Sequence, residues 1–345
     1  LGARYGRFTD PGDGLTTPAP PQLHSWLATV MGLGARTVIL EVTSHALRLG
    51  RVKGVPFAGG LLAAILPGEH TDFHHTYEDY VSAKRLFLNY LRPDAVLAYD
   101  ADNRASRQLA DEAAVATKLG FALGTAGGPV MQIDQASLDQ HGIVFRVGGR
   151  QIRSSLLGRP NIRNVALALT YAVASGMTID EVEPVLASLE PLPRRMERLH
   201  LAGRTVLDDT SGHPDSLMAL FEVADLLERK RSWIAWAIRG SRGVEVNRAN
   251  AFTLADLASL QEAAGLIVTA SEDVTSTADL VKAEEIDAVR AALQLRGRPY
   301  EFHATLQESM KAVAAKSGAG DLIVLAGAQG MNEGRRLLEQ ALRSG

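Results

Sequence analysis

Short apolar runs rich in β-branched residues alternate along this chain with longer segments of helical periodicity, and no other feature constrains the fold as strongly. This alternation is typical of parallel sheets whose strands are joined by crossover helices. Buried strands are expected at Thr37–Val42, Gly60–Ile65, Ala95–Tyr99, Thr205–Asp209, Trp233–Ile238, Gly265–Thr269 and Asp321–Ala326. Helical periodicity predicts helices near residues 21–33, 76–91, 104–118, 161–176, 179–189, 215–230, 253–263, 283–295 and 305–317. Two alternating runs around Gly148-Gly149, within Ile143–Ser154, predict a hairpin.

The length of the chain and two prolines past its middle predict two domains. A chain of 345 residues exceeds what one compact core usually holds. The segment Glu190–Arg195 carries two prolines between a helical pattern and a new β-rich run, so we expect the boundary there. The predicted fold class is α/β, with one domain over residues 1–193 and a second over residues 194–345.

The composition excludes several classes of protein. Lys and Arg number 36 against 39 Asp and Glu, so no basic excess exists to bind nucleic acid through its phosphates. The chain has no cysteine, which excludes disulfides, thiolate zinc sites and cysteine nucleophiles. No apolar run approaches the roughly twenty residues of a membrane span, and the first residues do not resemble a signal peptide. We expect a cytoplasmic monomer with no nucleic-acid or membrane partner.

Polar side chains stand at the end of the first expected strand. Glu41 is followed closely by Thr43-Ser44-His45. Parallel sheets place functional groups just beyond the carboxyl ends of their strands, so this group could bind a metal and a polar substrate. The same residues also suit a helix start, where Ser and Thr accept hydrogen bonds from free amide groups. The pattern leaves both interpretations open.

A second polar loop, Glu69–His74, follows the next expected strand. His70 and His74 have the i, i+4 spacing of zinc ligands on a helix, but the usual intervening glutamate is absent. The carboxylates of the loop suit an oxygen-preferring ion such as Mg²⁺ better, with help from one imidazole.

Lys84 lies on the apolar face of the helix expected over residues 76–91, between Tyr80 and Phe87. A lysine in such a place normally extends its amine outward to water. Alternatively, a desolvated and partly neutral amine can react with carbon dioxide to form a carbamate, an anion able to bind a metal. Spacing does not choose between the two.

These residues belong to a longer series of matches to one family. The chain resembles the Mur ligases, and within them the MurE-like branch of the UDP-N-acetylmuramoyl-tripeptide synthetase type. The matching segments, in the order of the family, are Thr16-Thr17-Pro18, Glu41–Leu47, Gly50-Arg51-Val52, Glu69–His74, Glu78–Phe87, Gly158–Asn164, Arg195–Arg198 and Asp209–Leu217.

The resemblance implies a central ATPase-type parallel sheet with flanking helices and a C-terminal Rossmann-like α/β domain. It implies a ligase that uses ATP and Mg²⁺ to convert a carboxylate into an acyl phosphate, and then adds an amino acid to a UDP-muramoyl peptide. By resemblance, the magnesium ligands and catalytic residues are Glu41, His70 and Lys84, with a carbamate on the lysine. The adenine nucleotide would contact Asn161, Asn164, Arg195 and Asp209. The sugar peptide would contact Thr16, Thr17, Thr43, Ser44 and Arg51.

Some family segments are altered in this chain. No Gly-x-x-x-x-Gly-Lys-Ser/Thr loop occurs, so either the chain is the remainder of a longer protein or its phosphate site has been lost. The family's diaminopimelate motif Asp-Asn-Pro-Arg is replaced by Ser271-Glu272-Asp273-Val274. The first hypothesis is therefore a Mur-type ligase with altered amino-acid specificity. The alternatives are a catalytically degenerate homologue that binds a sugar nucleotide or a partner protein, and a related ligase with another acceptor.

Overall fold

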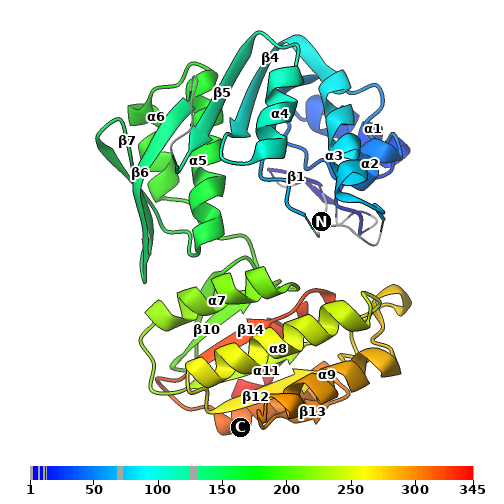
Figure 1. Ribbon diagram of the computed structural model, residues 1–345, viewed down its shortest axis with the longest axis vertical. Coiled ribbons are helices and arrows are strands. Elements are labelled where there is room, and N and C mark those ends of the chain that lie inside the picture. The colour runs from blue at the N-terminus through cyan, green and yellow to red at the C-terminus, as the bar shows by residue number, and fades with distance from the viewer. Residues whose placement is uncertain are drawn as a thin grey trace. The chain divides into compact units, whose positions relative to one another are not determined.

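The computed structural model describes residues 3–6, 8–10, 12, 14–67, 73–124 and 130–344. Contacts within the chain divide it into two compact units, and Figure 1 labels many of their elements. The first unit contains Leu1–Asp134 and Arg163–Val182, and the second contains Gln135–Ile162 and Glu183–Gly345. The hairpin expected around Gly148-Gly149 is thereby grouped with the second unit, and the boundary expected near residue 193 stays a prediction.

A six-stranded sheet begins in the first unit, with the strand order β3-β4-β5-β6-β7-β8. Its members are β3 (Phe57–Leu62), β4 (Leu91–Asp100), β5 (Thr117–Ala122), β6 (Val130–Asp139), β7 (Gly142–Val147) and β8 (Arg150–Ser154). Strands β3 to β6 pair in parallel, whereas β7 and β8 form the expected antiparallel hairpin. This arrangement confirms the predicted α/β class for this part of the chain.

Six α-helices accompany this sheet along the chain. They are α1 (Pro20–Gly32), α2 (Ser44–Arg48), α3 (Tyr77–Arg85), α4 (Arg104–Glu112), α5 (Arg159–Ala174) and α6 (Ile179–Ala187). A 3-10 turn, η1 (Leu86–Tyr90), follows α3, and a small hairpin of β1 (Ala3–Tyr5) and β2 (Phe8–Asp10) precedes α1. Side chains of Thr43, Thr76 and Asn103 accept hydrogen bonds from the free amides that begin α2, α3 and α4. These residue types are preferred at this position because their oxygens replace a missing backbone acceptor.

Two adjacent glycines let aromatic side chains approach both faces of β3. A Cβ atom on Gly59 would lie 2.0 Å from the hydroxyl of Tyr171 in α5, and one on Gly60 would lie 2.7 Å from the ring of Phe87 in η1. Because successive strand residues face opposite sides of a sheet, the two glycines admit one ring to each face. Any larger residue at either position would have to displace an aromatic ring.

The prediction of a strand at Thr37–Val42 was wrong. These residues are neither helix nor strand, and Ile39 is 93% exposed. Only Leu40 and Val42 of the run pack against the small cluster of Leu23, Leu47 and Val52. β-branched residues favour a strand where a neighbouring strand offers hydrogen bonds and packing, and no described strand pairs with this run.

Two predicted helices also had wrong bounds. The helix expected over residues 104–118 ends at Glu112, and the last part of that segment belongs instead to β5. The helix expected over residues 76–91 is divided between α3 and η1.

The second unit contains another six-stranded sheet, in the order β13-β12-β11-β14-β10-β9. Its strands are β9 (Glu197–Leu201), β10 (Arg204–Asp209), β11 (Ser232–Ala237), β12 (Gly265–Thr269), β13 (Glu301–His303) and β14 (Leu322–Ala326). All neighbours pair in parallel except β9, which is antiparallel to β10. Every residue of β11 and β14 is buried, as expected for central strands covered on both faces.

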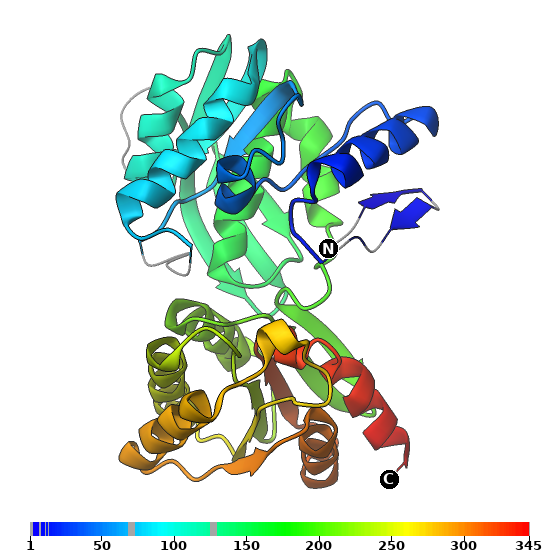
Figure 2. The same ribbon diagram turned by 90° about the vertical axis from the view of Figure 1, so that its right-hand side faces the viewer.

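Helices cover both faces of this second sheet, as Figure 2 shows. Its elements are α7 (Pro214–Leu226), α8 (Val244–Leu260), α9 (Ala283–Leu295), α10 (Leu306–Lys316) and α11 (Gly334–Ser344), with short 3-10 turns η2 (Thr277–Asp279) and η3 (Gln329–Met331). One face packs against α7, α8 and α9, with Trp236 in its core, and the other against α10 and α11, with Trp233. No helix in the described ranges is long and apolar enough to cross a membrane.

Candidate functional site

Predicted site residues from three loops of the first unit meet around Thr17. This side chain is fully buried, and its hydroxyl donates to the backbone oxygen of Glu41 over 2.8 Å. The amide of Thr43 donates to the same hydroxyl oxygen over 3.1 Å, and Arg51 Nη1 donates to the backbone oxygen of Thr17 over 3.0 Å. The loops that carry Thr16-Thr17, Glu41–Thr43 and Arg51 are therefore joined in one cluster. Their contact with a sugar peptide stays a prediction.

The predicted metal ligands are presented by different elements. Glu41 is exposed, and its carboxylate has no hydrogen-bond or ion-pair partner in the described ranges. Lys84 is half-buried on α3, and its Nζ atom lies 5.9 Å from the centre of the Tyr80 ring. His70 lies outside the described residues.

The described side chains define only part of a metal site. Among these, no three His, Cys, Asp or Glu residues come together in a way that could hold an ion. The exposed carboxylate of Glu41 fits an oxygen-preferring ion such as Mg²⁺. The full set of magnesium ligands, which comprises Glu41, His70 and a carbamate on Lys84, stays a prediction.

A buried histidine to which the resemblance assigned no role joins two of these elements. His74 is 1% exposed, with Nε2 2.9 Å from Ser44 Oγ and Nδ1 3.3 Å from Asp79 Oδ2. Ser44 begins α2 and is fully buried, whereas Asp79 lies in the first turn of α3 and also pairs with Arg48 of α2. Both His74 and Asp79 fall within segments that match the family, but only the tertiary structure shows that they meet.

Two predicted nucleotide contacts lie on α5. Asn161 is half-buried and donates from Nδ2 to the backbone oxygen of Leu157 over 2.7 Å. Asn164 follows three residues later and is exposed. Residues at this spacing share one face of a helix, so both amides lie on the same side of α5. Their contact with a nucleotide stays a prediction.

The other two predicted nucleotide contacts, Arg195 and Asp209, are neighbours in the second unit. Asp209, at the end of β10, is 7% exposed. One carboxylate oxygen accepts from the amide of Met196 over 2.9 Å, and the other accepts from the hydroxyl of Ser211 over 2.5 Å. Arg195 is exposed and donates to the hydroxyl of Thr210. Asp209 thus uses both oxygens to hold its own chain, and its contact with a nucleotide stays a prediction.

A buried ion pair that sequence analysis did not find stands beside Asp209. Arg194 Nε lies 3.2 Å from Oδ1 of Asp208, which is fully buried, and the same guanidinium donates to the backbone oxygens of Gly327 and Ala328. Burial raises the pKa of Asp208 to about 6, although the positive charge of Arg194 acts in the opposite direction. Oδ2 of Asp208 has no hydrogen-bond partner among the described residues. The signal in the sequence is a pair of adjacent acids in an apolar strand, since one of the two must face the core.

Glu285 occupies the amino end of α8 with its own carboxylate. It is 1% exposed and accepts hydrogen bonds from the amides of Ser241, Arg242 and Gly243 over 3.2, 3.0 and 2.8 Å. The side chain of Asn247 donates to it over 3.2 Å. Successive amides before a helix commonly bind a phosphate or another anion. Here the chain supplies that anion itself.

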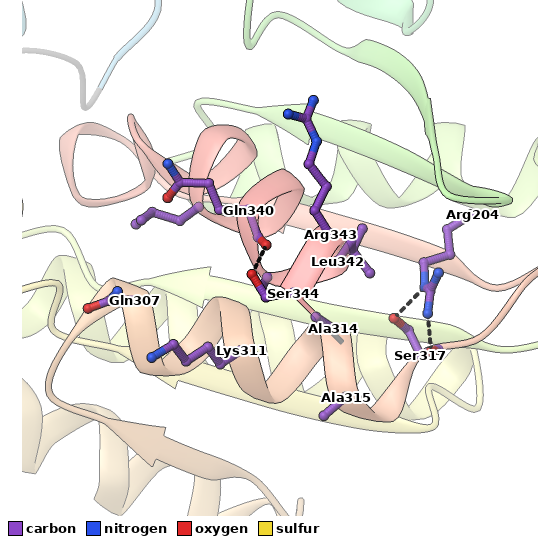
Figure 3. Close-up of a pocket in the computed structure, with 12 residues that line it drawn as sticks. Arg204, Gln307, Lys311, Ala314, Ala315, Ser317, Gln340, Leu342, Arg343 and Ser344 are labelled. Carbon is purple, nitrogen blue, oxygen red and sulfur yellow. Dashed lines mark hydrogen bonds between the residues drawn. The ribbon is translucent and has the colours of Figure 1, made fainter.

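A groove in the second unit contains none of the predicted site residues. It has a volume of about 980 Å³ and lies between α10 and α11 (Figure 3). Arg204 at its edge donates to the backbone oxygen of Ser317 over 2.6 Å, and Lys311 and Arg343 also line it. Small side chains, including Ala314 and Ala315, keep it open. We assign it no role in the reaction.

Known proteins resemble this chain in both sequence and fold. Residues 2–172 match the Mur ligase middle domain, and residues 194–329 match the Mur ligase glutamate ligase domain. The UDP-N-acetylmuramoyl-L-alanyl-D-glutamate--2,6-diaminopimelate ligase of Cytophaga hutchinsonii is 28% identical over 318 residues, which cover 90% of this chain and 62% of that protein. The chain thus spans less than two thirds of this relative's length.

Two solved structures support the same assignment at the level of the fold. A structure of a UDP-N-acetylmuramoyl-L-alanyl-D-glutamate--2,6-diaminopimelate ligase superposes with a TM-score of 0.58 at 22% identity, covering 94% of this chain and 67% of that one. The MurF ligase of Thermotoga maritima in complex with ADP superposes with a TM-score of 0.67 at 15% identity, covering 97% and 73%. With matches to two successive domains of one family over most of its length, this chain belongs to the Mur ligase family.

Proposed function

We propose that this chain carries the middle and C-terminal domains of an ATP- and Mg²⁺-dependent ligase that adds an amino acid to a UDP-muramoyl peptide. The observation that carries the proposal is the cluster of Thr17, Glu41, Thr43 and Arg51 in the first unit. These residues come from three separate loops, and each matches a family position proposed to serve the sugar peptide or the metal. Membership of the family supports the same reaction class.

The proposed reaction activates a carboxylate and then replaces phosphate by an amine. The peptide carboxylate takes the terminal phosphoryl group of ATP, which leaves ADP and an acyl phosphate. The amino group of the incoming amino acid attacks the acyl carbon, the bond from that carbon to the phosphate oxygen breaks, and inorganic phosphate leaves. Because ATP and the peptide carboxylate are both anions, positive charge must offset their repulsion during phosphoryl transfer.

The residues of the first unit divide this work between them. The guanidinium of Arg51 and the hydroxyls of Thr16 and Thr43 would hold and orient the charged sugar peptide. Glu41 and His70, with a carbamate on Lys84, would hold Mg²⁺. The ion, when bound, would supply the positive charge that phosphoryl transfer needs.

The altered motif of the second unit supports an amino acid other than diaminopimelate. Asp273 accepts hydrogen bonds from the amides of Leu306 and Gln307 over 2.8 and 3.1 Å at the start of α10. Ser271 is fully buried, and its amide donates to the hydroxyl of Thr269. These interactions serve the fold, which supports recognition of the amino acid by other residues.

Phosphate release by the natural full-length protein tests the proposal. The assay contains Mg-ATP, UDP-muramoyl dipeptide and pooled amino acids. We expect release that requires the sugar peptide, and its loss in Lys84→Ala with partial rescue by small carboxylates that replace the carbamate. Lys53→Ala, an exposed lysine, is the matched control and keeps full activity.

Each outcome of this assay separates the hypotheses. Omitting amino acids one at a time names the substrate. Full activity of Lys84→Ala would remove the carbamate from the proposal. Binding of the sugar nucleotide without phosphate release would favour the catalytically degenerate homologue instead.

A further inference from the structure

A chain of hydrogen-bonded side chains, of which Ser44 and His74 are buried and Asp79 is half-buried, joins the loop cluster around Thr17 to the helix that carries Lys84. Ser44 directly follows Thr43, and its hydroxyl lies 2.9 Å from Nε2 of His74. The other ring nitrogen of His74 lies 3.3 Å from Oδ2 of Asp79, in the first turn of α3. Arg48 of α2 pairs with the same aspartate. The connection therefore runs from α2 through the imidazole to α3.

The carboxylate of Asp79 indicates the direction of the first hydrogen bond. An ionised carboxylate can only accept, so Nδ1 of His74 donates to Asp79. In a ring that carries only this one proton, Nε2 is an acceptor and the Ser44 hydroxyl donates to it. A carboxylate that bonds one ring nitrogen in this way fixes the tautomer and the orientation of a histidine.

The order Ser–His–Asp is that of a nucleophilic triad, but burial excludes this role for Ser44. A serine nucleophile must reach the acyl carbon of a substrate from the protein surface. Ser44 is 0% exposed and His74 only 1% exposed. The three side chains therefore act on one another and hold the structure.

Aromatic contacts hold the imidazole of His74 in place. Its ring centre lies 4.9 Å from that of Phe73 in an edge-on arrangement and 5.4 Å from that of Tyr80. Tyr80 is 4% exposed and is the ring beneath the amine of Lys84. His74 thus contacts the residue that supports Lys84 on one side and the segment that contains Thr43 on the other.

We propose that His74 is a positioning residue. It fixes the turn at Thr43, which is predicted to contact the sugar peptide, relative to α3 and Lys84. The proposal rests on the proposed function, because it gives a role to the same site. Removing the imidazole would free the turn at Thr43 to move against α3. The binding of the sugar peptide should then weaken more than that of ATP.

Kinetics of the natural full-length protein test this role with two adjacent histidines. His74→Ala should raise KM for UDP-muramoyl dipeptide about 10- to 100-fold, by analogy with the loss typical of residues that orient metal ligands. KM for ATP should change much less. His74→Gln, which keeps a partner for Ser44, should restore part of the loss. The exposed neighbour His75 provides the matched control, and His75→Ala should leave both constants unchanged.

A double-mutant cycle and two physical readouts complete the test. Ser44→Ala and His74→Ala should be non-additive, because each removes the same hydrogen bond. Nitrogen NMR of the His74 ring should show the proton on Nδ1, and Asp79→Asn should abolish this preference. Amide hydrogen exchange of α2 should quicken in His74→Ala but not in His75→Ala.

The outcomes distinguish this proposal from the proposed function. A wild-type protein without turnover would contradict the proposed function, while the NMR and exchange measurements would still decide whether His74 holds α2 on α3. Equal KM values and equal α2 exchange in His74→Ala and His75→Ala would overturn the positioning role. So would a His74 ring that carries its proton on Nε2.

Discussion

Two stretches of this chain share a local pattern but differ in structure. Thr37–Val42 and β10 are both short, β-branched apolar runs with an acidic residue at or near the end. β10 pairs with β14 on one side and β9 on the other, and its Leu207 is fully buried. Thr37–Val42 has no partner strand in the described ranges, and Ile39 is 93% exposed. A β-prone run therefore becomes a strand only where the rest of the chain supplies its neighbours.

The acidic residues of the two stretches differ in the same way. Both oxygens of Asp209 are bonded within the second unit. Glu41 is held through its backbone oxygen by Thr17, which leaves its carboxylate exposed. An acid at the end of an apolar run is thus a strong functional candidate where the fold leaves its carboxylate unused.

The largest expected effect comes from truncating one apolar side chain in each stretch. Leu207→Ala should lower the free energy of unfolding by about 2–5 kcal/mol, because it leaves a cavity in a packed core. Ile39→Ala should change it by less than about 0.5 kcal/mol, as for other exposed positions. Urea unfolding of both variants measures the difference. A large loss for Ile39→Ala would show that this run is buried in solution and would break the comparison.

The next effect is a pH dependence that arises from Asp208 beside the end of β10. Its pKa is raised from 3.8 to about 6 in the folded state, so the folded protein holds a proton that the unfolded chain releases. Stability should therefore fall as the pH rises from 3.8 to about 6 and then stay level. The loss is on the order of 3 kcal/mol. Asp208→Asn should remove it.

Urea unfolding of wild type and Asp208→Asn at a series of pH values gives the measurement. Other titrating groups affect both proteins alike, so the difference between the two curves isolates Asp208. Parallel curves would contradict a buried, protonated Asp208.

The smallest expected change in stability distinguishes Asp209 from Glu41. Asp209→Ala leaves the buried amide of Met196 without an acceptor and should cost about 1–3 kcal/mol of stability. Glu41→Ala removes a carboxylate that has no described partner, so it should leave stability nearly unchanged and abolish phosphate release. Thermal unfolding and the phosphate assay on both variants check this. The comparison fails if Glu41→Ala destabilises the protein as much as Asp209→Ala.

Local patterns predicted some regular elements of this fold and missed others. The bounds predicted for β12 and α9 agree with the structure, because apolar periodicity and flanking turns define both. α11 was missed, since its arginines and glutamates conceal a narrow apolar stripe at Leu337 and Leu338. β5 was missed, and its first two residues, Thr117 and Lys118, were read as the end of a helix because the run is short and follows α4 closely.

The sequence predicted those site residues that lie in recognisable motifs, but not the contacts between them. Matching segments identified Thr17, Thr43 and Arg51, which the structure brings together. The hydrogen bonds from Ser44 through His74 to Asp79 join residues that are distant in the chain, so neither spacing nor residue type predicts them. The same is true of the pair of Arg194 and Asp208, which forms only when the second unit folds.

The carboxylate of Glu285 at the amino end of α8 has a consequence for ligands in solution. Because it is tethered to the same domain, its effective concentration at the three amides far exceeds that of a free anion. Phosphate or sulfate at ordinary concentrations therefore competes poorly for this position. The hydrogen bonds to Glu285 should therefore hold the loop from Ser241 to Gly243 in one shape whether or not such anions are present.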